Sequence, residues 1–155
     1  EQAGADLILV TCSSINEIPD YVRPLVSVPV LKIDEPMARE AVKSYTNIGV
    51  LATLQTTLKP TTQLIYRIAA EQGKKVKLKE VLCEGAFEAL TVKGGVEIHD
   101  QIIQKEIKRI ADQVEVIVLA QASMAQAAQN IILSVPVLTS PRLGVQAAID
   151  QLRKL

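Results

Sequence analysis

Residues 5–14 read ADLILVTCSS and residues 114–123 read VEVIVLAQAS, and these two stretches decide the fold. Each is a short aliphatic run that ends in small polar residues. The tetrapeptide VPVL follows at residues 28–31 and again at 135–138, at nearly the same offset. Buried strands can resemble each other without common origin, but the paired order favours a duplicated α/β unit. A duplicated unit implies two similar lobes with a cleft between them.

Aliphatic runs alternate with amphipathic stretches along the whole chain. We expect strands near residues 7–10, 28–33, 48–52, 76–82, 116–119 and 135–138. Apolar residues at helical spacing predict helices between them, including one after Pro36, one that ends at Gly73 and one after Pro141. Such alternation predicts an α/β fold with parallel sheets flanked by helices.

The duplication also predicts how the chain is divided. We expect residues 47–137 to form one lobe, and residues 1–46 with 138–155 to form what is present of the N-terminal lobe. The sequence opens without Met, on Glu-Gln-Ala-Gly, which resembles the last turn of a helix capped by glycine. We therefore expect the natural protein to begin upstream and the N-terminal lobe to be incomplete here.

Composition excludes several classes of function. The 155 residues carry 17 basic and 17 acidic side chains, and only 3% are aromatic, so neither a basic stripe nor stacking aromatics predict nucleic-acid binding. No apolar run is long enough to predict a membrane span. Two cysteines and one histidine are too few for a zinc cluster or a disulfide framework. We expect a cytoplasmic protein without a metal.

Polar elbows follow three of the predicted strands, at residues 11–14, 53–57 and 121–123. In open α/β sheets, ligands bind at the carboxyl ends of strands, and the N–H groups of a helix start suit a carboxylate. One elbow alone would indicate only helix caps, but three that converge predict a site for a small anion. The predicted ligand-binding residues are Thr11, Ser13, Ser14, Thr53, Gln55, Thr56, Thr57, Ala122 and Ser123.

Cys12 is the most reactive candidate in these elbows. Its position between a strand end and an expected helix start favours the thiolate, so the side chain could act as a base or a nucleophile. Cys83 follows an apolar strand without a hydroxyl cluster, which predicts a buried structural cysteine. His99 is predicted as a surface or helix-start residue. The less favoured alternative is that its side chain extends into the cleft.

Through these residues the sequence resembles the aspartate/glutamate/hydantoin racemase superfamily. The matching pieces are residues 4–14, 48–53 with Thr56, and 116–119 with the elbow that follows, joined by shorter pieces at 85–88 and 140–143. The resemblance implies a two-lobed, pseudo-symmetric α/β enzyme that needs no cofactor. It also implies a homodimer that acts on a small amino acid or carboxylate.

In that family two cysteines face each other across the cleft, one taking the α-proton and the other returning one. Cys12 matches the first cysteine, whereas Gln121 occupies the position of the second. A glutamine amide cannot serve as a general acid or base. The resemblance implies an isomerase with Cys12 as its base, for which a water or His99 would supply any second acid. The alternatives are a one-cysteine isomerase, lyase or decarboxylase of a small dicarboxylate, and a carboxylate-binding protein without catalysis.

Overall fold

The computed structural model describes residues 1–129 and 131–155. Its strands form two sheets in which every pairing is parallel. The small sheet contains β1 (Ile8–Val10) and β2 (Val30–Lys32). The large sheet has the order β4-β3-β5-β6, formed by β3 (Asn47–Ala52), β4 (Lys77–Leu82), β5 (Val116–Leu119) and β6 (Val137–Thr139). The predicted α/β fold with parallel sheets is confirmed.

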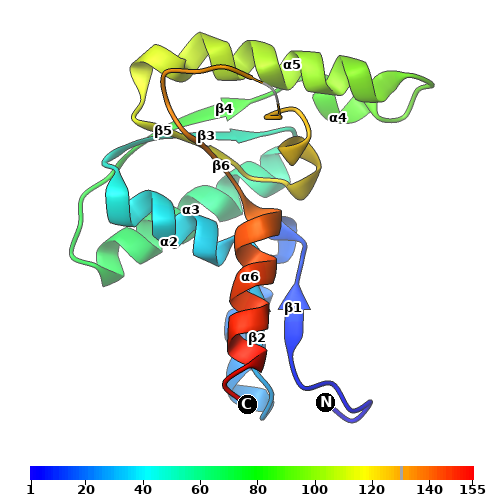
Figure 1. Cartoon of the computed structure of the whole chain (residues 1–155), viewed down its shortest axis with the longest axis vertical. Helices are drawn as coiled ribbons and strands as arrows, with labels where there is room; N and C mark the ends of the chain where they lie inside the picture. Colours follow the sequence, from blue (N-terminus) through cyan, green and yellow to red (C-terminus); the bar gives the residue numbers. More distant parts are fainter. Residues whose placement is uncertain (130) are drawn as a thin grey trace.

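Helices cover both faces of the large sheet (Figure 1). On one face lie α2 (Glu35–Ser44) and α3 (Gln55–Glu71), and on the other lie α4 (Ala86–Ala89) and α5 (Gly95–Ile110). Ile48, Val50 and Ala52 of β3 belong to the core under α2 and α3, whereas Leu51 belongs to the core under α5. Both faces are therefore apolar, as parallel strands between two helix layers require.

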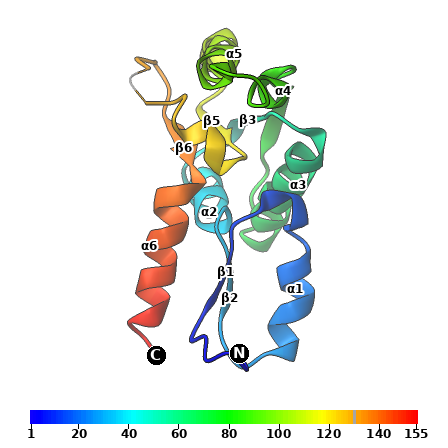
Figure 2. The same cartoon turned by 90° about the vertical axis from the view of Figure 1, so that its right-hand side faces the viewer.

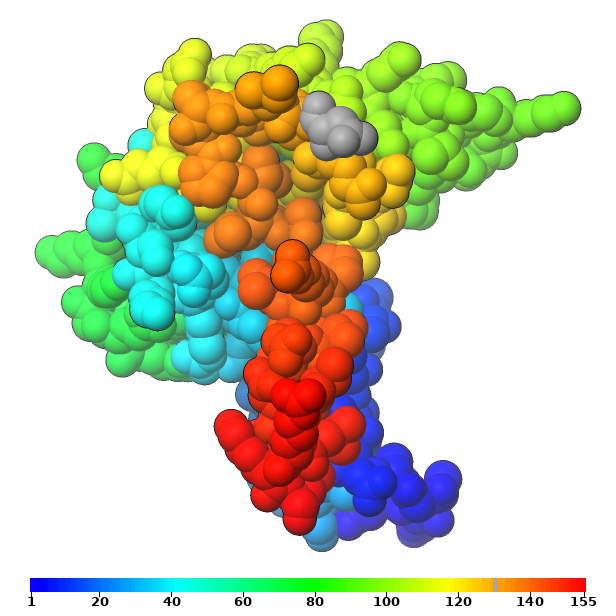
Figure 3. All heavy atoms as spheres, in the orientation of Figure 1, coloured from blue at the N-terminus to red at the C-terminus, as the bar shows by residue number. Residues whose placement is uncertain are grey.

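The small sheet projects from this body together with two helices. Figure 2 shows β1 and β2 between α1 (Ile18–Val22) and α6 (Ser140–Leu152), and Figure 3 shows that this part is narrower than the large-sheet body. A two-stranded sheet is marginally stable by itself. Its stability therefore depends on α1, α6 and the ends of α2 and α3.

Helix α6 approaches the end of β2 closely at Gly144. A Cβ atom added to Gly144 would lie 2.3 Å from the carbonyl oxygen of Ile33, a backbone atom that cannot rotate away. We therefore expect Gly144→Ala to lower the free energy of unfolding by about 1–3 kcal/mol. Urea unfolding would measure the loss, with Val145→Ala on the exposed face of α6 as the control. Equal midpoints for the two variants would contradict the tight contact.

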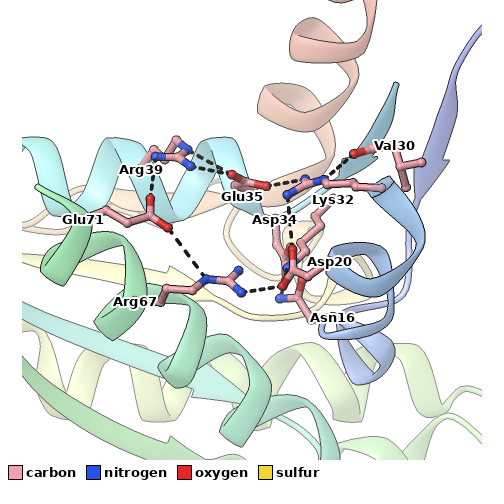
Figure 4. A network of polar contacts seen from close by, with 10 residues as sticks. Asn16, Asp20, Val30, Lys32, Asp34, Glu35, Arg39, Arg67 and Glu71 are labelled. Carbon is pink, nitrogen blue, oxygen red and sulfur yellow. Dashed lines mark hydrogen bonds and ion pairs between the residues drawn. The ribbon is translucent and has the colours of Figure 1, made fainter. Parts of the chain in front are cut away.

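Charged side chains tie the projecting part to the body (Figure 4). Asp20 of α1 accepts hydrogen bonds from Lys32 of β2, at 2.7 Å, and from Arg67 of α3. Arg23 donates to Asp20 at 3.2 Å and to Glu35 of α2 at 2.8 Å. The Lys32 side chain is only 2% exposed, so its partner Asp20 compensates an otherwise isolated buried charge.

Glu35 gives this network a pH dependence. Burial alone would raise the pKa of Glu35, but hydrogen bonds from Arg23 and Arg39 outweigh it and hold the pKa below its ordinary value. The pKa of Glu35 is lower in the folded protein than in the unfolded chain, where it is roughly 4.3. Its ionised carboxylate therefore stabilises the folded protein above that pH, and this contribution disappears as the pH falls through the pKa of the folded protein. We expect Glu35→Gln to cost about 1–2 kcal/mol at pH 7. Thermal melts from pH 7 to pH 3 should show that the melting temperatures of Glu35→Gln and the unmodified protein become similar at low pH. A difference in melting temperature that stays constant with pH would contradict this origin.

The predicted division into lobes stays a prediction, because helices at the predicted boundaries pack on both parts. Met37 and Ala41 of α2 lie in the core of the large sheet, although α2 directly follows β2. Helix α6 follows β6 of the large sheet and packs along α2 next to β2.

Candidate active site

The three polar elbows meet at the carboxyl ends of β1, β3 and β5. The hydroxyls of Ser14, after β1, and Thr57, in the first turn of α3, lie 3.2 Å apart and share a hydrogen bond. The backbone N–H of Thr53, after β3, donates to the side-chain oxygen of Gln121, after β5, at 2.7 Å. Residues from three separate parts of the sequence are thus joined through the loop after β3.

The residues of the elbows differ in exposure. Ser13, Thr53 and Thr57 are buried, Gln121 is half-buried, and Thr11, Cys12, Ser14, Gln55, Thr56, Ala122 and Ser123 are exposed. The buried members make the contacts that hold the elbows together. The exposed members form the surface that a ligand would meet.

The expectation that a helix starts at the Cys12 elbow is wrong, and the elbow after β5 does not begin an α-helix either. Residues Ser13–Ile15 and Ala122–Ala125 form single 3₁₀ turns, and neither has a side-chain cap. A helix from Ser14 would place Pro19 in its interior, where proline removes a backbone donor, and α1 instead begins at Ile18 with Pro19 in its first turn. Only α3 supplies a long helix start, at Gln55. Any dipole contribution to anion binding therefore comes mainly from α3.

The side chain of Gln121 joins the elbow after β5 to the elbow after β3. Its oxygen accepts from the N–H of Thr53 at 2.7 Å and lies 3.1 Å from the Thr53 hydroxyl, and its amide nitrogen donates to the same hydroxyl at 2.8 Å. Gln121 therefore cross-links the ends of two strands.

The two cysteines lie in opposite environments. Cys12 is exposed at the end of β1, whereas Cys83 is buried in the core under α5. Burial, with a smaller contribution from the charge of Glu106, raises the pKa of Cys83 to about 12. Cys83 is thus a structural thiol, as its sequence position predicts.

This difference predicts selective alkylation. At pH 8 a thiol whose pKa is about 12 is ionised to only ~10⁻⁴, and the Cys83 sulfur is also shielded from solvent. We expect iodoacetamide to modify Cys12 at least about 100-fold faster than Cys83 in the folded protein. Peptide mass spectrometry would measure both rates, and urea should make them similar. Comparable rates without urea would contradict the burial of Cys83.

His99 is not a surface residue, so the favoured prediction for it is wrong. It is 1% exposed because it lies on the same face of α5 as Ile103 and Ile107, which pack into the core. Its Nδ1 lies 2.8 Å from a carboxylate oxygen of Asp100. Its Nε2 is buried, with no hydrogen-bond partner among the described residues. Among the described residues, its ring forms no hydrogen bond with Cys12 or Gln121.

Sequence reasoning missed a buried pair behind the Cys12 elbow. The amide nitrogen of Asn16 donates to Asp34 at 2.8 Å, and both side chains are buried. Burial raises the pKa of Asp34, against a hydrogen bond from Ser13 and the charge of Lys32. Asp34 lies two residues after the end of β2, and ligands of α/β proteins bind at strand ends of this kind as well.

Three hollows lie away from the elbows. One of about 560 Å³ lies between β2, α2 and α6, one of about 490 Å³ between α1 and α3, and one of about 370 Å³ beside the start of α6. Neither Cys12 nor Gln121 lines any of the three.

Within residues 1–129 and 131–155, no three or more His, Cys, Asp or Glu residues are grouped so that they could hold a metal ion. Within the same ranges, no helix combines the length and the apolar character needed to cross a membrane.

Parallel strands, helices on both sheet faces and joined elbows at the strand ends define an α/β protein with a polar surface at the ends of its strands. The chain belongs to the Asp/Glu/hydantoin racemase family, whose family model matches residues 1–148. No curated protein matches the sequence.

Solved racemases share the fold at low sequence identity. Allantoin racemase from Klebsiella pneumoniae superposes with a TM-score of 0.75 at 20% identity, covering 98% of this chain and 61% of that one. Glutamate racemase from Francisella tularensis, in complex with D-glutamate, gives 0.71 at 12% identity, covering 99% and 59%. Glutamate racemase RacE1 from Bacillus anthracis gives 0.66 at 15% identity, covering 96% and 59%. The chain thus spans about three fifths of the length of these relatives.

Proposed function

We propose that this chain carries half of the proton-transfer machinery of a cofactor-independent isomerase, with the Cys12 thiolate as the base that removes an α-proton from a small amino acid or carboxylate. The observation that carries the proposal is the position of Cys12. It is an exposed thiol at the carboxyl end of β1, next to elbows that hydrogen bonds join into one surface.

The joined elbows would hold the substrate carboxylate beside this thiol. The first N–H groups of a helical turn have no partner within the turn, and such turns begin at Ser13, Gln55 and Ala122. The exposed hydroxyls of Ser14, Thr56 and Ser123 add further donors. Donors directed at a carboxylate would also stabilise the enolate-like charge that develops when the α-proton leaves.

Gln121 supports a second candidate function. The amide that would face Cys12 across the substrate is bound to Thr53 and cannot transfer protons. A single thiol can remove and return a proton on one face, which gives exchange without inversion, or protonate an intermediate after decarboxylation or elimination. A one-cysteine isomerase, lyase or decarboxylase is therefore the second candidate. A carboxylate-binding protein without catalysis is the remaining outcome.

Proton NMR in deuterium oxide tests these possibilities together. The protein would be incubated with small amino acids and dicarboxylates, and the α-proton signals followed over time. Loss of an α-proton signal supports Cys12 as a base, and chiral chromatography of the same sample separates inversion from exchange with retention. Saturable binding of the same compounds without exchange or new product would overturn the enzymatic proposal in favour of a binding protein.

A further inference from the structure

Asp34 lies beside the Cys12 elbow because of the register of the small sheet. Val10 pairs with Lys32 in parallel register, and the Ile33 N–H donates to the Val10 carbonyl at 3.0 Å. The hydrogen bond from Asn16 to Asp34 shows that Asp34, two residues after the end of β2, lies against the turn that follows Cys12. Asp34 is 1% exposed, so its carboxylate is directed into the protein and not toward solvent.

The Asp34 carboxylate binds the turn that follows Cys12. It accepts from the Asn16 amide at 2.8 Å, and the Ser13 side chain lies close enough to lower the pKa of Asp34. Ser13 is the first residue of that 3₁₀ turn and Asn16 is its C-cap. Because an ionised carboxylate only accepts, it can hold both donors at once.

Helix capping does not explain this carboxylate. Asp34 is the N-cap residue of α2, a position where an aspartate side chain ordinarily accepts from the N–H groups of the first turn. Here its side chain makes no such hydrogen bond, and only its backbone carbonyl serves the helix, accepting from Ala38 at 3.0 Å. The side chain is instead directed to the elbow after β1.

We propose that Asp34 is a positioning residue, which fixes the turn at residues 13–16 and thereby the place of Cys12 relative to the elbow of α3. The consequence for catalysis rests on the proposed function of Cys12. The need for such a contact is physical, since a single 3₁₀ turn is followed only by the short α1, and neither constrains the elbow strongly. Asp34 reaches the substrate only through Ser13, Asn16 and the backbone between them.

The direction of the hydrogen bond, from the Asn16 amide to the Asp34 carboxylate, provides the test. Asp34→Asn replaces a charged acceptor by a neutral amide, which weakens the hydrogen bond from Asn16, and we expect amide hydrogen exchange at residues 12–16 to become at least about tenfold faster. Combining Asp34→Asn with Asn16→Asp restores one donor and one acceptor in reverse, with the new amide at position 34 still able to accept from Ser13. We expect the double variant to regain most of the protection. The matched control is Glu35→Gln, which weakens the neighbouring ion pairs without a bond to the elbow.

Activity is measured separately on the same proteins. A displaced thiol should lower kcat by about 10- to 100-fold with KM within about threefold, and the double variant should recover kcat. Unchanged exchange at residues 12–16 in Asp34→Asn, or an increase equal to that in Glu35→Gln, would overturn the positioning role. A double variant whose amide hydrogen exchange at residues 12–16 is no slower than that of Asp34→Asn would also overturn it. Absence of turnover in the unmodified protein would instead remove the proposed function, while the exchange data would still decide the role of Asp34.

Discussion

The Cys12→Ala variant is expected to lose α-proton exchange by about a thousandfold or more, because general-base catalysis typically contributes 10² to 10⁴ and the described elbows offer no other base. The remaining elbow side chains are hydroxyls and amides, which do not take a proton from carbon near neutral pH. Proton NMR in deuterium oxide with the best substrate of the unmodified protein would measure the loss.

The second cysteine is the matched control for this experiment. Cys83→Ala removes a buried thiol from the core under α5, so it should lower stability while leaving the exchange rate within about twofold. Cys12 is exposed, so its replacement should change the melting temperature little. Undiminished exchange in Cys12→Ala, or a loss of equal size in both variants, would remove Cys12 from the mechanism.

The fold could be predicted because buried parallel strands consist of short runs of aliphatic residues, which are recognisable in the sequence. The runs at residues 7–10 and 48–52 became β1 and β3, and the expected helix after Pro36 became α2. Its inward face of Met37, Ala38, Ala41 and Val42 is buried as the helical spacing predicts. Local periodicity was sufficient here, since each element buries its own apolar side.

The site was less accessible to the same reasoning. The elbow positions follow from strand ends, but the Gln121–Thr53 and Ser14–Thr57 contacts join residues 68 and 43 positions apart in the chain. Such pairings depend on strand order, which periodicity does not give. The Asp34 side chain was missed for a related reason: an aspartate before a helix looks like a cap, and its use by a neighbouring strand's elbow is visible only in three dimensions.

His99 shows the limit of judging a polar residue by type. Its helical spacing to Ile103 and Ile107 placed it on the buried face, and that signal was present in the sequence. The expectation of a surface residue gave the polarity of the ring more weight than its position on the helix. Burial became possible because Asp100 is placed to pair with Nδ1.

Gln121→Cys should give the protein a capacity for inversion that one thiol cannot provide. The family resemblance implies that position 121 is that of the second cysteine, so with a thiol there one sulfur could remove a proton and the other return one to the opposite face. For a substrate that the unmodified protein exchanges with retention, we expect interconversion of the two enantiomers to increase by at least about tenfold, in the lower part of the range for acid–base catalysis. Chiral chromatography at successive times would measure it.

The same substitution removes the hydrogen bonds to Thr53, and its effects must be separated from that loss. The buried Thr53 N–H would lose its acceptor, which should cost about 1–3 kcal/mol of stability. Gln121→Ser is the control, because serine is close in size to cysteine and likewise lacks the amide, but its hydroxyl is too weak an acid to replace the thiol. Inversion in the cysteine variant alone would show that this fold has kept the geometry of two-base chemistry. Inversion in neither variant, with α-proton exchange retained in both, would mean that position 121 no longer faces Cys12 across the substrate, and that the one-cysteine reaction is what this site performs.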